Sequence, residues 1–216
     1  MNRYLILTAL SMIMAFASCT KHMDLPDTST KIGDVLCTDG SVVPQNKCTS
    51  NGLVPIAVVF HLCDPETEEG TAYAVYLDDL SPVAFADSIG IKQNTSADIL
   101  ERDGNANTYA IFSTAAIGSP MADAVFSMWR YGQSAYVPSV AQMQLMYASK
   151  EYVNDCLKKC GGTPLSDSPD DCWYWTSTEV SGQETAKAWL YSIVTGARQE
   201  TPKDESHKVR PVVTIY

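Results

Sequence analysis

Six cysteines spread along the chain have the clearest chemistry in this 216-residue sequence. Cysteine thiols either pair as disulfides or bind a metal such as zinc. A zinc site is disfavoured, because no two of the six have C-x-x-C spacing and the only histidine near any of them in sequence is His61. The pattern predicts disulfides and no metal site, with these candidates: Cys37, Cys48, Cys63, Cys156, Cys160 and Cys172.

The positions of these cysteines restrict how they can pair. Three precede residue 64 and three follow residue 155, so if all six pair, at least one bridge joins the first third of the domain to the last. Such a bridge closes a loop of about 100 residues, which stabilises the fold by about 4 to 5 kcal/mol if it acts on the entropy of the unfolded chain. We expect no free thiol among the six.

A seventh cysteine, Cys19, ends a segment with the features of an export signal. Residues 1–18 have one early positive charge, an apolar run that ends at Phe16, and the small residues Ala17 and Ser18. The run is shorter than the roughly 20 apolar residues that span a bilayer. It resembles the lipobox of bacterial lipoproteins, with Phe16 where leucine is usual; the alternative is an ordinary cleaved signal. The resemblance implies a lipidated Cys19 that anchors the chain in the bacterial envelope, with the outer membrane expected.

The segment after Cys19 is polar, contains a proline and shows no periodicity, so residues 19–31 are expected to form the lipidated end and a tether. Residues 32–216 are enough for one domain with a sizeable core. The whole chain has a net charge of −10, and without Arg3 of the signal it keeps 14 Lys and Arg against 25 Asp and Glu. Nucleic acid is therefore not an expected partner.

The aromatic stretch "DDCWYWTSTEV", residues 170–180, could be either a ligand platform or part of a core. Alternation along a strand places Trp173 and Trp175 on one face and Tyr174 on the other. We expect Trp175 in the core. Trp173 is the weak candidate for a ligand-binding ring.

No recognisable catalytic motif is present, and no catalytic residue is predicted. The histidines His22, His61 and His207 are expected to be structural or solvated. The acidic pairs at 78–79 and 170–171 lie at predicted turns, where carboxylates are usually solvated, although one pair could hold calcium. We expect no other cofactor.

Strands are expected at both ends of the domain and helices in its middle. A hairpin that turns at Asp39-Gly40 is predicted within residues 32–43, followed by a buried strand at 55–62 and a third strand at 71–77. Residues 92–107 are polar and are expected to form a surface loop.

Helical periodicity follows at 107–118 and 120–132, each ending at a glycine. A capping box of Ser139 and Gln142 starts a further helix, and residues 151–162 predict another. Antiparallel strands are expected at 172–179, at 186–194 with a turn at Thr195-Gly196, and at 207–216.

Five sequence blocks occur in the order seen in a large bacterial surface family of unknown function. The chain resembles the C-terminal domain of bacterial collagen-like adhesins and, more distantly, the formylglycine-generating enzymes. The blocks are "DGNANTYAIF" (103–112), "AYVPSVAQMQLMY" (135–147), "YWTSTE" (174–179), "AWLYSIVTG" (188–196) and "KVRPVV" (208–213). The family's usual Trp-Tyr-Leu-Pro is "AYVP" here, and Trp-Ser-Ser-Thr-Glu is "WTSTE".

This resemblance implies an α+β, C-type lectin-like fold, with antiparallel sheets and helices between the N-terminal and C-terminal strands. It favours a lipid-anchored envelope binding module, such as an adhesin or fimbria-associated protein with a glycan or matrix ligand. The alternatives are a modifying enzyme or enzyme accessory on the same fold, and a structural envelope lipoprotein. Neither Glu-Pro-Asn nor Trp-Asn-Asp is present, so calcium-dependent sugar binding is not expected.

Overall fold

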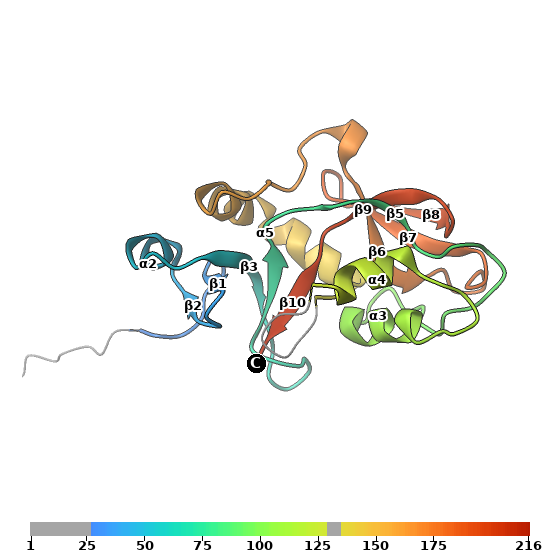
Figure 1. Cartoon of the computed structure of the whole chain (residues 1–216), viewed down its shortest axis with the longest axis horizontal. Coiled ribbons are helices and arrows are strands. Elements are labelled where there is room, and N and C mark those ends of the chain that lie inside the picture. Colours follow the sequence, from blue (N-terminus) through green and yellow to red (C-terminus); the bar gives the residue numbers. More distant parts are fainter. Residues whose placement is uncertain (1–26, 129–134) are drawn as a thin grey trace, which may run out of the picture.

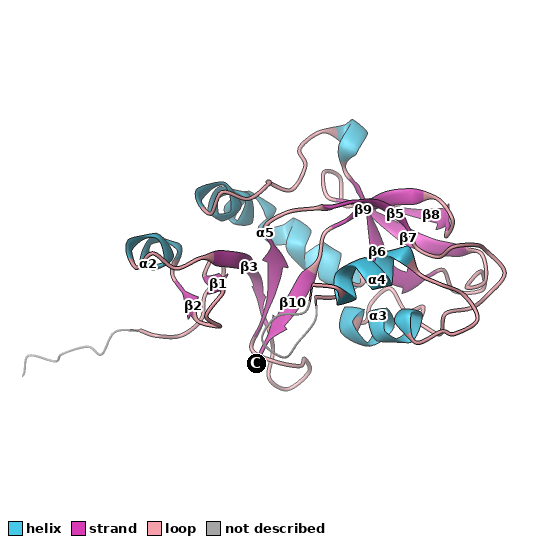
Figure 2. Ribbon diagram, viewed as in Figure 1, coloured by secondary structure: helices cyan, strands magenta, loops and turns pink. Residues whose placement is uncertain are grey.

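Two five-stranded β-sheets and a long helix make up most of the α+β fold. The computed structural model describes residues 27–128 and 135–216. Figures 1 and 2 show the first sheet and the short helix α2 toward one end of the molecule, and the second sheet toward the other. The α+β class agrees with the sequence, whereas the C-type lectin-like assignment stays a prediction.

The first sheet is antiparallel, with strand order β10-β4-β3-β1-β2. Its first hairpin turns at Asp39-Gly40 as predicted, and Gly40 has φ 85°, which glycine adopts without a Cβ clash. The β-branched run at 55–62 forms the predicted buried strand. The strands are β1 (Val35–Cys37), β2 (Val42–Val43), β3 (Pro55–Leu62), β4 (Ala72–Tyr76) and β10 (Val212–Ile215).

The second sheet is mixed, with strand order β5-β9-β6-β7-β8. Strand β6 pairs antiparallel with β7 but parallel with β9, which corrects the expectation of a wholly antiparallel C-terminal sheet. The last predicted strand is two strands, because the chain leaves this sheet at Arg210-Pro211 and enters the first. The strands are β5 (Leu80–Ala84), β6 (Trp173–Glu179), β7 (Lys187–Ser192), β8 (Arg198–Pro202) and β9 (Ser206–Val209).

The predicted capping box is present at the start of α5. The Ser139 hydroxyl accepts a hydrogen bond from Gln142 N, and the Gln142 side chain accepts one from Ser139 N. The helix runs without a break to Lys159, so the two helices expected here are one. The helices are α2 (Gln45–Ser50), α3 (Gly104–Phe112), α4 (Pro120–Phe126), α5 (Val140–Lys159) and the 3₁₀ turn η1 (Pro169–Asp171).

The sheets contribute to two hydrophobic cores. Alternate residues of β3 serve each core: Ala57 and Val59 pack with α3 and α4, whereas Val58 and Phe60 pack with α5. Strand β6 divides in the same way, with Trp175 in the first core and Tyr174 in the second. This period of two is what the sequence predicts for a strand covered on both faces.

Trp175 is fully buried, which confirms that it is a core residue. Its ring meets Phe85 and His207 edge to face, with centroids 5.5 and 5.3 Å away. Its indole nitrogen donates to Val83 O at 3.0 Å, which satisfies its one polar atom and ties the edge strand β5 to the core.

The buried Arg210 fastens the crossing between the two sheets. It donates to Asp79 Oδ1 at 2.8 Å and to the carbonyl oxygens of Leu77 and Thr163 at 2.9 and 2.7 Å. These bonds join the β4–β5 connection and the segment after α5 to the point where β9 ends. A buried guanidinium is tolerated when it is paired in this way.

The prediction of a surface loop at 92–107 is partly wrong. Gln93 and Thr95 are buried, and α3 already starts at Gly104. A Cβ at Gly104 would lie 2.3 Å from Gln142 Oε1 and 2.7 Å from Val137 O, so glycine allows this close approach to the start of α5. The polar side chains turn inward because they meet a buried carboxylate, described below. The predicted helix stop at Gly132 lies outside the described residues.

Candidate functional site

The site centres on the loop between β5 and α3. The carboxylate of Glu179 holds this loop in place through hydrogen bonds. Glu179 Oε1 accepts a hydrogen bond from Gln93 N at 2.8 Å. Glu179 Oε2 accepts bonds from the backbone and the hydroxyl of Thr95 at 3.2 and 3.1 Å. The last residue of "YWTSTE" is therefore the anchor of a loop more than eighty positions earlier in the chain.

Lys203 completes this anchor as a fully buried cation. Its ammonium lies 2.7 Å from Glu179 Oε1, and both side chains are 0% exposed. It also donates to Ile91 O at 2.9 Å and to Gln93 Oε1 at 3.1 Å. Burial lowers the pKa of Lys203, while the carboxylate of Glu179 works against that shift. A pair of this kind persists only when its remaining hydrogen-bonding positions are satisfied, as most of them are here.

The loop that Glu179 and Lys203 anchor has a strained backbone at two residues. Asn94 and Ala97 have φ values of 61° and 55°, in the left-handed region that residues with a Cβ rarely occupy. Such strain persists where surrounding contacts determine the backbone. Residues 96–103 of this loop run over the surface and include Leu100, whose side chain is among the most exposed hydrophobic ones. We call residues 96–103 the crest loop.

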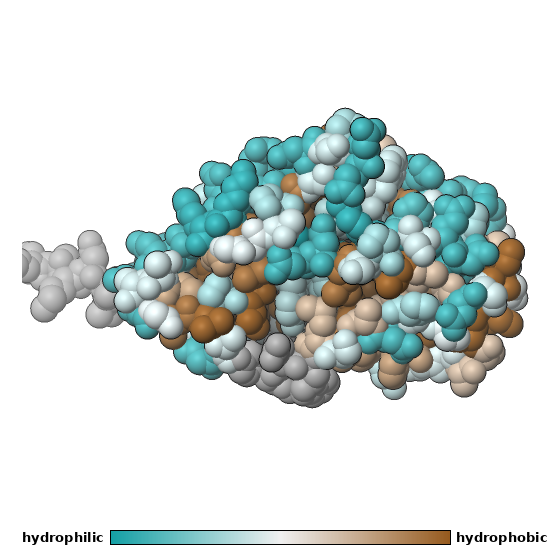
Figure 3. Space-filling model, turned by 45° about the horizontal axis from the view of Figure 1, so that its top comes forward, coloured by the Kyte–Doolittle hydropathy of each residue, from teal (hydrophilic) through white to brown (hydrophobic). Residues whose placement is uncertain are grey.

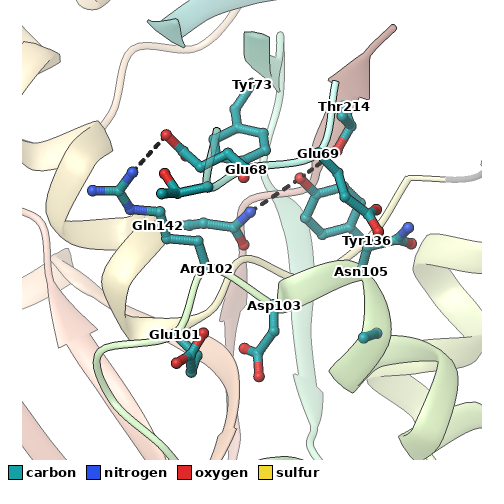
Figure 4. Close-up of a pocket in the computed structure, with 12 residues that line it drawn as sticks. Glu68, Glu69, Tyr73, Glu101, Arg102, Asp103, Asn105, Tyr136, Gln142 and Thr214 are labelled. Carbon is teal, nitrogen blue, oxygen red and sulfur yellow. Dashed lines mark hydrogen bonds and ion pairs between the residues drawn. The ribbon is translucent and has the colours of Figure 1, made fainter. Parts of the chain in front are cut away.

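On one side of the crest loop lies a hollow of about 200 Å³, which we call the acidic cleft (Figure 4). Its polar floor comes from three buried side chains: the Tyr136 hydroxyl contacts Thr214 Oγ1 at 3.0 Å and accepts from Gln142 Nε2 at 3.2 Å. Carboxylates dominate the walls, with one arginine among them. The wall residues include Glu68, Glu69, Glu101, Arg102, Asp103 and Tyr73.

Glu68 is the central charge of the acidic cleft. Its side chain is 2% exposed, and its Oε2 lies 2.6 Å from Arg102 Nη1 and 3.1 Å from His61 Nε2. Burial alone raises the pKa of Glu68, but the backbone of Asp64, His61 and Arg102 together hold it below its usual value. Glu68 is therefore an ionised carboxylate at neutral pH.

On the other side of the crest loop lies a wider hollow of about 470 Å³, which we call the Trp189 groove. Trp189 lies on β7, and its half-exposed ring has the Arg198 guanidinium 5.9 Å from its centroid. The Trp189 indole nitrogen is buried and has no hydrogen-bond partner among the residues described. Glu200 and Asp98 also line the groove. An aromatic ring with charged neighbours and an unused donor is suited to a polar ligand that also has apolar faces.

Trp173, the ring singled out from the sequence, packs against both cores and is only half exposed. Trp189 was not singled out, although a signal for it was available. It alternates with the buried Ala188 and Leu190, so the period of two places its ring on the other face of β7. Its neighbours on β8 are Glu200, directly opposite, and Arg198, which pairs with Tyr191; both placements depend on strand register, which the sequence does not specify.

The six disulfide candidates lie in different surroundings. Cys37 and Cys48 share one small core, with Sγ atoms 3.5 Å apart, and Cys160 packs against the same core. The first and last thirds of the domain therefore meet at cysteines, although all six are thiols in the structure. Cys63 lies near Tyr73 and Glu68, and Cys172 contacts Ser192 Oγ at 3.2 Å. The pairing itself stays a prediction.

Burial raises the pKa of the Cys37 thiol to about 12 and the pKa of both Cys63 and Cys160 to about 11. As thiols, these cysteines are protonated at neutral pH. Nucleophilic catalysis requires a thiolate, which a lowered pKa provides. Their surroundings do not supply that activation.

The acidic pairs considered for calcium mostly face protein donors. Asp79 accepts from Arg210 and Tyr174, Asp78 from Thr163, and Asp171 from Lys208. In residues 27–128 and 135–216, no group of three or more His, Cys, Asp or Glu side chains is placed to hold a metal ion.

Two of the three histidines have contacts in the structure. His61 contacts Glu68, and His207 packs against Trp175 and lies 3.5 Å from Glu205. His22 and Cys19 lie outside the described residues, as do the signal and most of the tether. None of the described helices is long and apolar enough to cross a membrane. Figure 3 shows one face, where hydrophobic residues form separate patches among hydrophilic ones.

Comparisons with known proteins support the fold only. No protein-family model matches the chain, and no curated protein matches its sequence. A fimbrial protein from Bacteroides ovatus has a similar structure, with a TM-score of 0.65 and 17% sequence identity. The match covers 84% of this chain and 48% of that one, so the chain spans about half the length of its structural neighbour.

Proposed function

We propose that this chain is a binding module of the bacterial cell envelope, anchored by lipid at Cys19, with its ligand site around the crest loop. An adhesin or fimbria-associated role fits these features, with a glycan or a protein of the host matrix as ligand. One observation carries the proposal: a loop held in place by the buried Glu179–Lys203 pair borders two hollows, the acidic cleft and the Trp189 groove.

The structural neighbour and the charge of the chain support this class of function. The neighbour is described as a fimbrial protein, which gives weak support for a surface role. The net charge of −10 disfavours nucleic acid and strongly anionic glycans as partners. A neutral or cationic ligand is therefore favoured.

The Trp189 groove has the chemistry for the main contact with such a ligand. Sugar rings and extended peptides both have apolar faces that pack on an indole, and both have acceptors for its unused N–H. Glu200 adds an acceptor to the lining of the groove, and Arg198 adds a donor beside the Trp189 ring. A hollow of about 470 Å³ lies within the roughly 300 to 1,000 Å³ of typical ligand pockets.

Replacing Trp189 with alanine is expected to weaken binding about tenfold or more. The change removes an aromatic anchor, and truncation of such anchors commonly costs more than 1.4 kcal/mol, a factor of ten in affinity. The test is binding of the purified full-length protein to glycan arrays and to immobilised matrix proteins, followed by titration of the best ligand with wild type and Trp189→Ala.

Trp173→Ala is the matched control, because it removes the same side chain from the neighbouring strand β6. It should leave affinity within about twofold once its folding is confirmed by circular dichroism. Absence of any ligand on both panels would refute the proposal. Loss of binding in Trp173→Ala but not in Trp189→Ala would place the site elsewhere.

Replacing Cys19 with serine is expected to move the protein from the membrane fraction to the soluble fraction. Serine cannot form the thioether that attaches the lipid, and each buried methylene of an acyl chain contributes about 0.8 kcal/mol to membrane binding. Fractionation of cells that express the two full-length chains measures the shift. A Cys19→Ser protein that stays with membranes would exclude this anchor.

A further inference from the structure

The acidic cleft contains one buried oxygen with no partner. Glu68 Oε2 receives Arg102, His61 and the Asp64 backbone N–H, the last at 2.9 Å. Glu68 Oε1 is equally buried and has no hydrogen-bond partner among the described residues. Tyr73 lies beside this carboxylate, which adds to the larger effect of burial in raising the pKa of Tyr73. A buried charged oxygen without a partner is costly, so a donor that reached it would be stabilised.

The groups around Glu68 select a positive charge. Glu69, Glu101 and Asp103 also line the cleft, and Arg102 is the cation among its lining residues. Arg102 is already paired with Glu68 at 2.6 Å, so its charge is not free to attract an anion. In the floor, Gln142 already donates one of its two amide N–H groups to the Tyr136 hydroxyl at 3.2 Å. An anionic ligand would therefore meet repulsion and few free donors.

The size of the cleft selects a slender group. A hollow of about 200 Å³ is smaller than a typical ligand pocket of roughly 300 Å³ or more, so it suits one side chain better than a whole ligand. Glu68 is 2% exposed, and an ammonium at the end of an unbranched chain can reach deeper than an amine attached directly to a sugar ring. A lysine ammonium brings three donors and no acceptor, which matches a site rich in acceptors.

We propose that the acidic cleft binds the ammonium group of a lysine side chain from a protein partner, next to the buried carboxylate of Glu68. Here the ammonium donates to Glu68 Oε1, and Glu101 and Asp103 add favourable charge at the rim. The inference rests on the proposed function for the location of the ligand, and it names the chemical group that the second hollow accepts.

The probe is Nα-acetyl-lysine methylamide, titrated against the full-length protein and followed by saturation-transfer NMR. Nα-acetyl-norleucine methylamide is the control ligand, because it has the same aliphatic stem without the ammonium. The lysine probe should bind at least tenfold more tightly than the norleucine probe, and rising salt should weaken only the lysine probe. Equal binding of the two probes, or tighter binding of glucosamine, would overturn the proposal.

Glu68→Gln keeps the shape of the side chain and removes its charge, so it should weaken lysine-probe binding at least tenfold. Because that change also disturbs Arg102 and His61, Glu101→Gln serves as a second variant at an exposed wall position, with an expected loss of about two- to threefold. Glu151→Gln is the matched control, because it removes an exposed carboxylate on α5 that lines neither hollow, and it should change nothing. Full binding in both Glu68→Gln and Glu101→Gln would refute the site.

The two ligand tests can fail separately. A protein that binds the lysine probe but nothing on the glycan and matrix panels would keep this inference and reject the proposed function. A protein that binds a panel ligand through Trp189 but not the lysine probe would do the reverse.

Discussion

A Trp175→Ala protein is expected to lose about 3 to 5 kcal/mol of unfolding free energy, the range for large buried side chains that leave a cavity. Trp175 is fully buried, so the substitution removes its packing against Phe85 and His207 together with the hydrogen bond to Val83 O. A typical domain is stable by about 5 to 15 kcal/mol, so this one change makes folding marginal. Urea unfolding followed by circular dichroism measures it without relying on tryptophan fluorescence.

Two controls separate cavity formation from the general loss of an aromatic residue. Trp175→Phe keeps a ring in the core and loses the bond to Val83 O, so its cost should be smaller than that of alanine. Trp173→Ala removes a half-exposed ring and should also cost less. If Trp175→Ala unfolds at the same urea concentration as wild type, with an unchanged dependence on urea, Trp175 does not hold this core together.

The elements that sequence predicts well here depend on local signals. The capping box at Ser139 and Gln142 lies within one helical turn. The turn at Asp39-Gly40 depends on the positive φ of Gly40. Strand β3 is recognised by its β-branched run between two turn signals. In each case the residues that decide the structure are close together in the chain.

The elements that were missed depend on distant partners. Strand β5 contains Pro82, which argues against a central strand, and it is in fact an edge strand paired only with β9. The parallel pairing of β6 with β9 brings Tyr174 opposite Lys208, a register that no local pattern specifies. Helix α2 has only six residues and no side-chain cap, so it has little sequence signal of its own.

The same limit explains the partial error at residues 92–107. Polar residues usually form solvated loops, and Gln93 and Thr95 lie within the polar run 92–96, which does not itself indicate burial. Their burial follows from Glu179 at the end of β6 and Lys203 in the turn after β8, which supply hydrogen bonds inside the protein. The buried polar network is therefore the part of the site that is hardest to predict from this sequence.

Lys203→Met is expected to lower the free energy of unfolding by about 3 to 5 kcal/mol, because it leaves the fully buried Glu179 carboxylate without its cation. The loss should also release the loop, since Lys203 contacts Ile91 O and Gln93 Oε1. Faster amide hydrogen exchange in residues 91–103 and weaker ligand binding are expected along with the change in unfolding free energy.

A double-mutant cycle with Glu179→Gln isolates the contribution of the pair. Each single variant leaves one buried group unpaired, whereas Glu179→Gln with Lys203→Met removes both charges and should recover part of the stability. Lys187→Met is the matched control, because the Lys187–Glu200 pair has a similar length of 3.2 Å but is one-third exposed, and such pairs are worth about 1 kcal/mol or less. If Lys203→Met costs no more than Lys187→Met, the buried pair does not anchor the crest loop. The two hollows beside that loop would then need another support to keep their shape for a ligand.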